Sequence, residues 1–163
     1  MAETDQKLLT FALGSEGYGI SILKVIEIIG MLDITPVPKT PNFIKGVINL
    51  RGKIIPVMDL RLKFGMEEKE YNERTCIIVV EINLNGTQRL LGVVVDMVSE
   101  VVTLSSDQIE PPPEYGTQAE NNFILGIGKI KDRVVIILDI DETFFSNEVL
   151  QMLDQYSAQE RFH

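Results

Sequence analysis

The sequence lacks most of the side chains from which catalytic and metal centres are built. It contains one histidine, His163, and one cysteine, Cys76. A single histidine excludes sites assembled from several imidazoles, and the β-branched run around Cys76 predicts a buried, inert thiol. Gly126 and Gly128 lack the third glycine and the Lys-Ser/Thr ending of a phosphate-binding loop. With no convergent acid, base and nucleophile, we predict a binding protein that is not an enzyme, with no catalytic residue, no cofactor and no bound metal.

Long hydrophobic runs and an excess of positive charge are also absent. Runs such as 134–138 are far shorter than the roughly 20 apolar residues that a membrane-spanning helix needs. The first residues lack the basic and apolar regions of a signal peptide. The net charge of -9 disfavours nucleic acid and anionic membrane surfaces, because both attract clustered cations. We therefore expect a cytoplasmic protein with no nucleic-acid partner and no direct membrane insertion.

Positive charge is nevertheless concentrated in one stretch of the chain. Between residues 39 and 63, six basic side chains accompany a single acid, Asp59. Two interpretations stay open at this point: a solvated strand face, or a docking surface for an acidic partner.

The residues that the sequence has in abundance are β-branched. Isoleucine and valine together supply 35 of the 163 residues, and both favour strands over helices. Short strands separated by turns containing Gly or Pro are typical of small β-barrels. Asn42 predicts a single helical turn that ends near Gly46. After the last strand, Ser146 is suited to cap a helix that continues through Leu153.

An internal duplication is the most informative feature of the sequence. Residues 42–60 and 122–140 agree in kind at 14 of 19 positions, and five of these are identical. The match extends upstream, where 19–29 aligns with 92–102 and Gly, Val and Glu recur at the same spacing. Two copies of one module predict a pair of similar lobes.

The two matches also locate an insertion and the limits of each lobe. The offset between the copies is 80 positions for the first match and 73 for the second, so the second copy carries seven extra residues near Pro111–Pro113. Insertions belong in surface loops. We expect one domain over 8–150, with a first repeat over about 8–65 and a second over about 75–145. Whether the two repeats exchange terminal strands stays open at this point. Residues 151–163 would form a C-terminal helix or tail.

One motif resembles an enzyme signature. The strand predicted over 134–138 is followed by Asp139, Asp141 and Thr143, which resembles the nucleophile motif of haloacid dehalogenase-like phosphatases. That motif opens a large α/β domain, whereas twenty residues follow Thr143. Asp59 stands at the same place in the first copy, so a strand-end or helix-capping role explains Asp139 without catalysis. A metal-dependent phosphatase that uses Asp139 and Asp141 is the minor alternative.

Residues 43–61 are similar to the CheW family of bacterial chemotaxis adaptors, and the likeness covers roughly 8–150. The resemblance implies a mostly β fold of two intertwined, pseudo-symmetric, five-stranded SH3-like barrels, with short connecting helices and a C-terminal helix. It also implies a noncatalytic scaffold without a cofactor. The partners would be the regulatory domain of the histidine kinase CheA and the cytoplasmic hairpin tips of chemoreceptors, with recruitment to membrane-anchored receptor clusters.

The resemblance assigns a coupling turn to the first copy. Asn49, Leu50, Arg51 and Gly52 match the family signature, whose arginine is associated with coupling to the kinase and the receptor. The second copy has 129–132, Lys-Ile-Lys-Asp, at this place, so Arg51 departs from what the fold alone requires. Its planar guanidinium suits a carboxylate or carbonyl of a partner better than lysine would.

A second group of residues matches the receptor-facing positions of the family. This group consists of Ile22, Val25, Glu27, Gly46 and Val101. An amphipathic helical hairpin needs an apolar groove with a few polar contacts, which fits these residue types. Valine and glutamate recur in the second copy at the places of Val25 and Glu27, so a role in folding remains the alternative for these two.

Other binding proteins with the same module stay open as alternatives. The chain could be a CheW-like coupling domain of a larger regulator, such as one fused to a receiver domain or the C-terminal part of the kinase.

Overall fold

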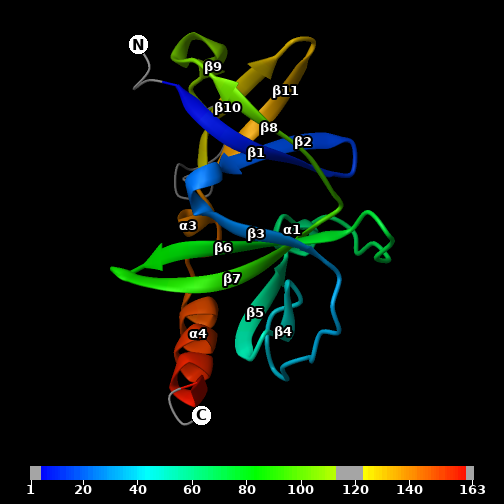
Figure 1. Cartoon of the computed structure of the whole chain (residues 1–163), viewed down its shortest axis with the longest axis vertical. Coiled ribbons are helices and arrows are strands. Elements are labelled where there is room, and N and C mark those ends of the chain that lie inside the picture. The colour runs from blue at the N-terminus through cyan, green and yellow to red at the C-terminus, as the bar shows by residue number, and fades with distance from the viewer. Residues whose placement is uncertain (1–4, 113–122, 161–163) are drawn as a thin grey trace.

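The computed structural model describes residues 5–112 and 123–160. The expected insertion after Pro111 falls largely on 113–122, and it lies outside the described residues together with His163. In the described ranges, no helix is both long enough and apolar enough to cross a membrane. The described chain is mostly β, as the sequence predicted, and its strands form two sheets that Figure 1 shows one above the other.

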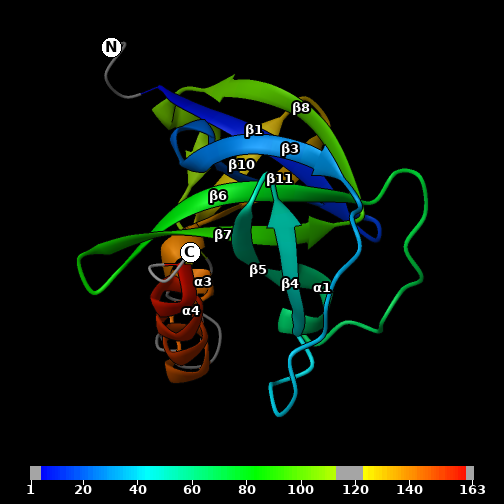
Figure 2. The ribbon, with the colours of Figure 1, turned by 60° about the horizontal axis from the view of Figure 1, so that its bottom comes forward.

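The upper sheet in Figure 1 has six strands. Their order is β8 (Met97–Leu104), β1 (Gln6–Leu13), β2 (Glu16–Ser21), β11 (Arg133–Leu138), β10 (Ile124–Ile130) and β9 (Ile109–Glu110). The lower sheet has five strands. Their order is β3 (Val25–Gly30), β6 (Cys76–Leu84), β7 (Thr87–Val95), β5 (Lys53–Asp59) and β4 (Ile44–Leu50). Both sheets are strongly curved, as the view in Figure 2 shows.

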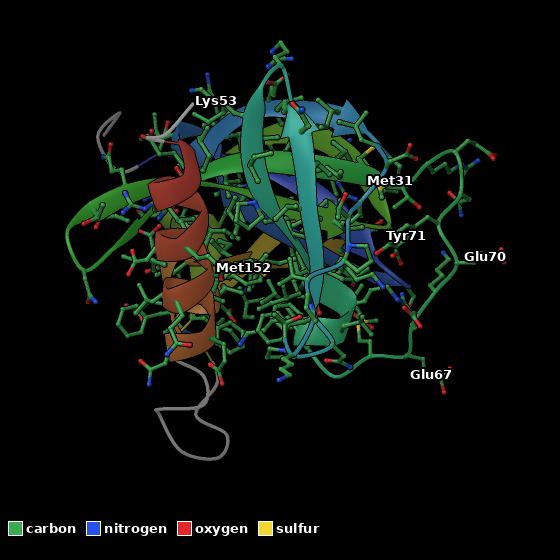
Figure 3. The ribbon with its side chains drawn as sticks, turned by 90° about the horizontal axis from the view of Figure 1, so that it is seen from below. Met31, Lys53, Glu67, Glu70, Tyr71 and Met152 are labelled. Atoms are coloured by element: carbon green, nitrogen blue, oxygen red, sulfur yellow. The ribbon has the colours of Figure 1, made fainter. Side chains whose placement is uncertain are left out.

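In the described ranges, helical segments are short except for the last one. They are the 3-10 turns η2 (Ile22–Lys24) and η3 (Ser106–Gln108), and the helices α1 (Leu60–Lys63), α3 (Ile140–Thr143) and α4 (Asn147–Glu160). The expected cap of α4 is present, because the Val149 amide donates a hydrogen bond to Ser146 Oγ at 3.3 Å. Val149, Met152 and Leu153 bury one face of α4 against the five-stranded sheet, and Figure 3 shows Met152 on this helix.

Each sheet combines strands from both copies of the duplication. The six-stranded sheet takes β1 and β2 from the first copy and β8 to β11 from the second, whereas the five-stranded sheet takes β6 and β7 from the second copy and β3 to β5 from the first. The joins are parallel pairs in equivalent registers, in which Ile137 faces Gly19 and Val57 faces Gly92. A Cβ atom at Gly92 would lie 3.4 Å from Val57 Cγ2 across this join and 3.0 Å from Ile77 Cγ2 of β6, so glycine leaves room for both neighbouring strands. The two copies are therefore exchanged across the pseudo-symmetry.

The predicted helical turn between Asn42 and Gly46 is wrong. Strand β4 already begins at Ile44, and Gly46 lies inside it with a φ of +141°. A Cβ atom at Gly46 would lie 2.0 Å from the carbonyl oxygen of Thr35, which forms two backbone hydrogen bonds with Val47. Glycine is needed here for close backbone approach and not to end a helix.

The second copy repeats this approach with a different chain segment. A Cβ atom at Gly126 would lie 2.8 Å from the carbonyl oxygen of Glu110 on β9. Strand β9 thus occupies the place that Thr35 holds in the first copy, and it supplies the sixth strand where five were expected.

Cys76 is half-buried at the start of β6, whereas a fully buried thiol was expected. Its Sγ donates to the carbonyl oxygen of Arg74 at 3.2 Å.

Candidate functional site

Exposed apolar side chains gather along the segment that contains η2 and β3. Side chains of β3 alternate between partly buried and exposed, and β3 is an edge strand of its sheet. We call the exposed set the β3 stripe: Leu23, which is 90% exposed, with Ile26, Ile28 and Leu32. None of these four residues was among those predicted to bind a partner, although apolar residues on both faces of an edge strand are a signal of a binding surface.

The hairpin between β4 and β5 displays Arg51 at its tip. Arg51 and Gly52 both have positive φ values, 53° and 89°, as a two-residue type I′ turn requires. Asn49 Oδ1 accepts a hydrogen bond from the Gly52 amide at 2.8 Å, which fixes the turn. Leu50 packs into the core of the five-stranded sheet. Of the four coupling residues from the resemblance, Arg51 is thus the one whose functional group is presented, and the other three shape the turn.

An ion pair joins the two predicted groups of site residues. The Arg51 guanidinium donates to a carboxylate oxygen of Glu27, and the two side chains come from opposite edges of the five-stranded sheet. Arg51 stays largely exposed in this pair, whereas Glu27 is partly covered. The ion pair thus involves β3, the strand that carries Ile26 and Ile28, and Glu27 lies on its partly buried face.

The second copy contains an equivalent ion pair. Arg133 Nη2 donates to Glu100 Oε1 at 3.0 Å. Glu100 corresponds to Glu27, but Arg133 corresponds to Lys53, which is two positions after Arg51. Comparison of residue types alone missed this recurrence. The pairing of a β-strand glutamate with a hairpin arginine belongs to both halves of the fold.

The other receptor-facing residues of the resemblance do not form one patch. Ile22 and Val25 are half-buried and pack against the central core. Val101 is exposed, but it lies on β8 at the edge of the six-stranded sheet. Gly46 is buried, and the clearance that Thr35 demands accounts for it.

The basic stretch between residues 39 and 63 does not form a concentrated positive surface. Besides Arg51, Lys45 pairs with Glu68 at 2.8 Å and Arg61 pairs with Asp96 at 2.8 Å. The ammonium group of Lys63 lies 4.6 Å from the centre of the Phe43 ring. These contacts favour the interpretation as a solvated face with paired charges.

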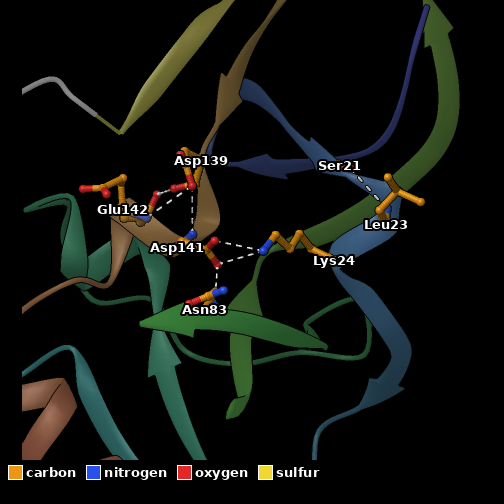
Figure 4. Close-up of polar contacts among 8 residues, drawn as sticks. Ser21, Leu23, Lys24, Asn83, Asp139, Asp141 and Glu142 are labelled. Atoms are coloured by element: carbon orange, nitrogen blue, oxygen red, sulfur yellow. Dashed lines mark hydrogen bonds and ion pairs between the residues drawn. The ribbon is translucent and has the colours of Figure 1, made fainter. Parts of the chain in front are cut away.

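The carboxylates of the phosphatase-like motif are used by the fold (Figure 4). Asp139 caps α3 by accepting from the amides of Asp141 and Glu142 at 3.1 and 3.3 Å. Asp141 accepts hydrogen bonds from Lys24 Nζ at 2.9 Å and from the backbone amide of Asn83 at 2.9 Å. Among the residues that the structure describes, no three His, Cys, Asp or Glu side chains are grouped as metal ligands would be. The motif is a pair of structural carboxylates.

Comparison with known proteins agrees with this geometry. The sequence model of the CheW-like domain matches residues 7–148. The chain belongs to the CheW family. A protein of Klebsiella aerogenes named chemotaxis protein CheW is 45% identical over 144 residues, covering 88% of this chain and 84% of the relative. The CheW of Helicobacter pylori is 38% identical over 136 residues, covering 83% and 79%.

A solved CheW structure has the same fold. The crystal structure of the scaffolding protein TtCheW from Thermoanaerobacter tengcongensis superposes with a TM-score of 0.75 and 39% sequence identity, covering 88% of this chain and 94% of that one. The predicted family and the mostly β architecture are confirmed. The CheW family is noncatalytic, in agreement with the structural roles of Asp139 and Asp141.

Proposed function

We propose that the chain is a noncatalytic adaptor of bacterial chemotaxis, which couples the cytoplasmic tips of chemoreceptors to the histidine kinase CheA. Membership of the CheW family supports this function. The proposal includes a cytoplasmic location at membrane-anchored receptor clusters. It also includes one folding unit over residues 8–150, because strands of the two copies pair with each other.

The observation that carries the receptor side of the proposal is the β3 stripe with the Glu27–Arg51 pair beside it. A receptor tip is an antiparallel helical hairpin, and amphipathic helices dock on apolar surfaces that carry a few polar contacts. Leu23, Ile26 and Ile28 offer such an apolar surface. Glu27 and Arg51 offer one acceptor and several donors at its margin. We assign Ile22 and Val25, which pack against the central core, to support of this surface from behind, and Gly46 to the close approach of Thr35 to β4.

For the kinase side we propose the regulatory domain of CheA as the partner. We propose side-by-side strand contacts at the edge strands β8 and β3, because the outer side of the third edge strand, β4, already pairs with Thr35. Asn49 and Gly52 hold the hairpin tip in place, and Arg51 is presented toward solvent for coupling.

Binding measurements with purified components test the function. The chain is titrated with a receptor cytoplasmic fragment, and separately with the CheA regulatory domain, up to about tens of micromolar, the range of weak signalling contacts. We expect a complex with each partner. Absence of both complexes would overturn the proposal.

A pair of matched variants tests the receptor surface. Ile26→Lys places a charge in the β3 stripe, whereas Val134→Lys makes the same kind of change at an exposed β-branched residue of the other sheet. We expect Ile26→Lys to weaken receptor binding about tenfold or more, as loss of a central apolar contact does. Val134→Lys should leave it unchanged. Equal effects of the two variants would contradict the assignment of the stripe.

A further inference from the structure

The chain crosses between the two sheets at two places among the described strands. The first crossing joins β2 to β3 through η2, and the second joins β7 to β8 through Asp96. Each crossing carries a charged residue, Lys24 in the first and Asp96 in the second. Both residues form ion pairs with the short helix that follows the last strand of one copy, α1 after β5 and α3 after β11.

The cluster at the second crossing is centred on the Asp96 carboxylate. Asp96 Oδ2 accepts from Arg61 Nη1 of α1 at 2.8 Å and from the amide of Gly14, in the β1–β2 turn, at 2.7 Å. The side chains of Arg61 and Asp96 are only 15% and 12% exposed. Helix α1 follows β5 of the five-stranded sheet, and the β1–β2 turn belongs to the six-stranded sheet. One carboxylate therefore ties the two sheets together.

The cluster at the first crossing is centred on Asp141 and is drawn in Figure 4. Asp141 of α3 accepts two hydrogen bonds from Lys24 Nζ, at 2.9 and 3.1 Å, and one from the Asn83 amide of β6 at 2.9 Å. Helix α3 follows the six-stranded sheet, and β6 belongs to the five-stranded sheet. The parts are those of the other cluster: a crossing residue, a short helix and a hairpin amide of the opposite sheet.

The two clusters have reversed charge. Arg61 and Asp141 stand at equivalent positions of the duplication, 80 residues apart, and they carry opposite charges. The crossing residues that they bind, Asp96 and Lys24, are reversed to match. An ion pair between the crossing and the following helix thus recurs in both halves, although Lys24 aligns with Met97, one position after Asp96. Similarity between the copies does not reveal this, because the charges are reversed and the crossing residues are offset by one position.

The apolar contact between the sheets does not by itself define their angle. One core cluster contains side chains of both sheets, such as Phe11 and Leu13 together with Ile78 and Val80. Burial of apolar surface is strong but non-directional. Charged hydrogen bonds depend on geometry and are costly to break when they are shielded from water. Two such clusters at separate crossings restrict rotation as well as separation.

We propose that the Asp96–Arg61 and Asp141–Lys24 clusters fix the angle between the two sheets and are the positioning residues of the partner-binding surface. They hold the β3 stripe of one sheet in a set position relative to Val101 on the edge of the other. The consequence for binding rests on the proposed function. The consequence for the angle concerns the free protein alone.

Distance measurements between spin labels test the angle. In a Cys76→Ser background, labels at Thr103→Cys and Gln88→Cys report the distance between the sheets, since both positions are exposed and lie on β8 and β7. Labels at Gln88→Cys and Lys53→Cys report a distance within the five-stranded sheet.

The variants remove one charge from each cluster while retaining a polar group. We expect Asp96→Asn and Lys24→Gln each to broaden the distance distribution between the sheets, and the double variant to broaden it further, with no change within one sheet. Glu110→Gln is the control, because its exposed pair with Lys129 lies inside one sheet. An unchanged distribution in the folded double variant overturns the proposal. Broadening within one sheet as well overturns it too, because the clusters would then support folding in general.

If Asp96→Asn unfolds, the Lys24→Gln variant alone still tests the proposal. Of the two cations in the clusters, Lys24 is more exposed than Arg61, and removal of its charge leaves the Asp139 cap of α3 in place. Receptor binding supplies a separate readout. We expect the double variant to bind a receptor fragment about threefold to tenfold more weakly, in proportion to the fraction of molecules with the competent angle. If the unmodified protein binds no receptor fragment, the proposed function fails while the distance result stands.

Discussion

The hydroxyl group of Tyr71 donates a hydrogen bond to the buried carboxylate of Asp59, with 2.8 Å between Tyr71 Oη and Asp59 Oδ2. Tyr71 lies in the connector between α1 and β6, which Figure 3 shows at the side of the molecule together with Glu67 and Glu70. The other carboxylate oxygen of Asp59 caps α1 by accepting from the Leu62 amide at 3.2 Å. This contact attaches the connector to the end of β5.

Removal of the Tyr71 hydroxyl should destabilise the protein. In Tyr71→Phe the buried Asp59 oxygen loses its donor, and we expect the free energy of unfolding to fall by about 1–3 kcal/mol. Urea unfolding of the variant measures the change. Tyr18→Phe is a control, because the Tyr18 hydroxyl has no hydrogen-bond partner among the described residues, and we expect a much smaller effect. Equal losses in the two variants would show that the contact with Asp59 contributes nothing specific.

The same contact predicts a dependence on alkaline pH. Burial, followed by the hydrogen bond to Asp59, raises the pKa of Tyr71 well above its ordinary value of 10.0. A folded-state pKa above the unfolded value gives stability that is complete below pH 10 and is lost as the pH rises beyond it, since the unfolded chain then ionises first. We expect the unfolding free energy of Tyr71→Phe to fall less steeply above pH 10 than that of the unmodified protein. Identical slopes would contradict this.

Alanine at Gly46 should damage the fold, and receptor binding should fall only as a result. The new Cβ atom would overlap the Thr35 carbonyl oxygen in a backbone conformation that disfavours side chains, so we expect a loss of about 3 kcal/mol or more. Gly30→Ala is the matched control on β3, at the opposite edge of the same sheet, because a Cβ atom at Gly30 meets nothing within 4 Å. Thermal unfolding of both variants checks the prediction. A stable Gly46→Ala protein with lost binding would instead favour direct contact with a partner.

Charge reversal at Arg51 should affect binding more than stability. Exposed ion pairs contribute about 0–1 kcal/mol, so Arg51→Glu should unfold at nearly the same urea concentration while its affinity for the partners falls. Arg133→Glu makes the same change in the equivalent pair of the second copy. We expect the Arg133 variant to retain its affinity for receptor fragments. The double change Glu27→Arg with Arg51→Glu restores the ion pair, and recovery of binding by it would show that the pair matters more than the identity of each partner.

Helix α4 should stabilise the five-stranded sheet. Leu153 is fully buried between α4 and the core, so Leu153→Ala should cost about 2–5 kcal/mol. Gln151→Ala, on the exposed face of the same helix, should change stability by less than about 0.5 kcal/mol. Urea unfolding monitored by circular dichroism measures both. A small effect of Leu153→Ala would mean that the sheet is stable without this contact.

Local pattern predicted the elements well, because alternation and turn chemistry are properties of neighbouring residues. The cap at Ser146, which the sequence predicted, depends on residues within a few positions, as do the hairpin at Arg51 and Gly52 and the short helix after Asp59. The sequence also revealed two similar halves. The helical turn predicted at Gly46 is absent because glycine at this position makes room for the Thr35 carbonyl group. Thr35 is 11 positions away, so this contact leaves no local signal in the sequence.

The exchange of strands is a feature that pattern alone could not establish. Because the copies share one pattern of apolar residues, pairing within a copy and pairing between copies satisfy it equally well. Only the packed core distinguishes them, through contacts such as Gly92 with Val57. The Glu27–Arg51 pair and the clusters around Asp96 and Asp141 likewise join residues far apart in the chain.

The parallel joins at Gly19 and Gly92 mean that neither half of the chain holds a complete sheet. A cut in the exposed connector near Glu70 would give two fragments, each with open strand edges and an uncovered apolar face that only the other fragment fits. A single copy of the module could complete its sheets only by pairing with a second copy, and the duplicated chain makes that contact within one molecule. Reassembly of the two fragments from separate peptides would show that the joins are sufficient to bring the halves together.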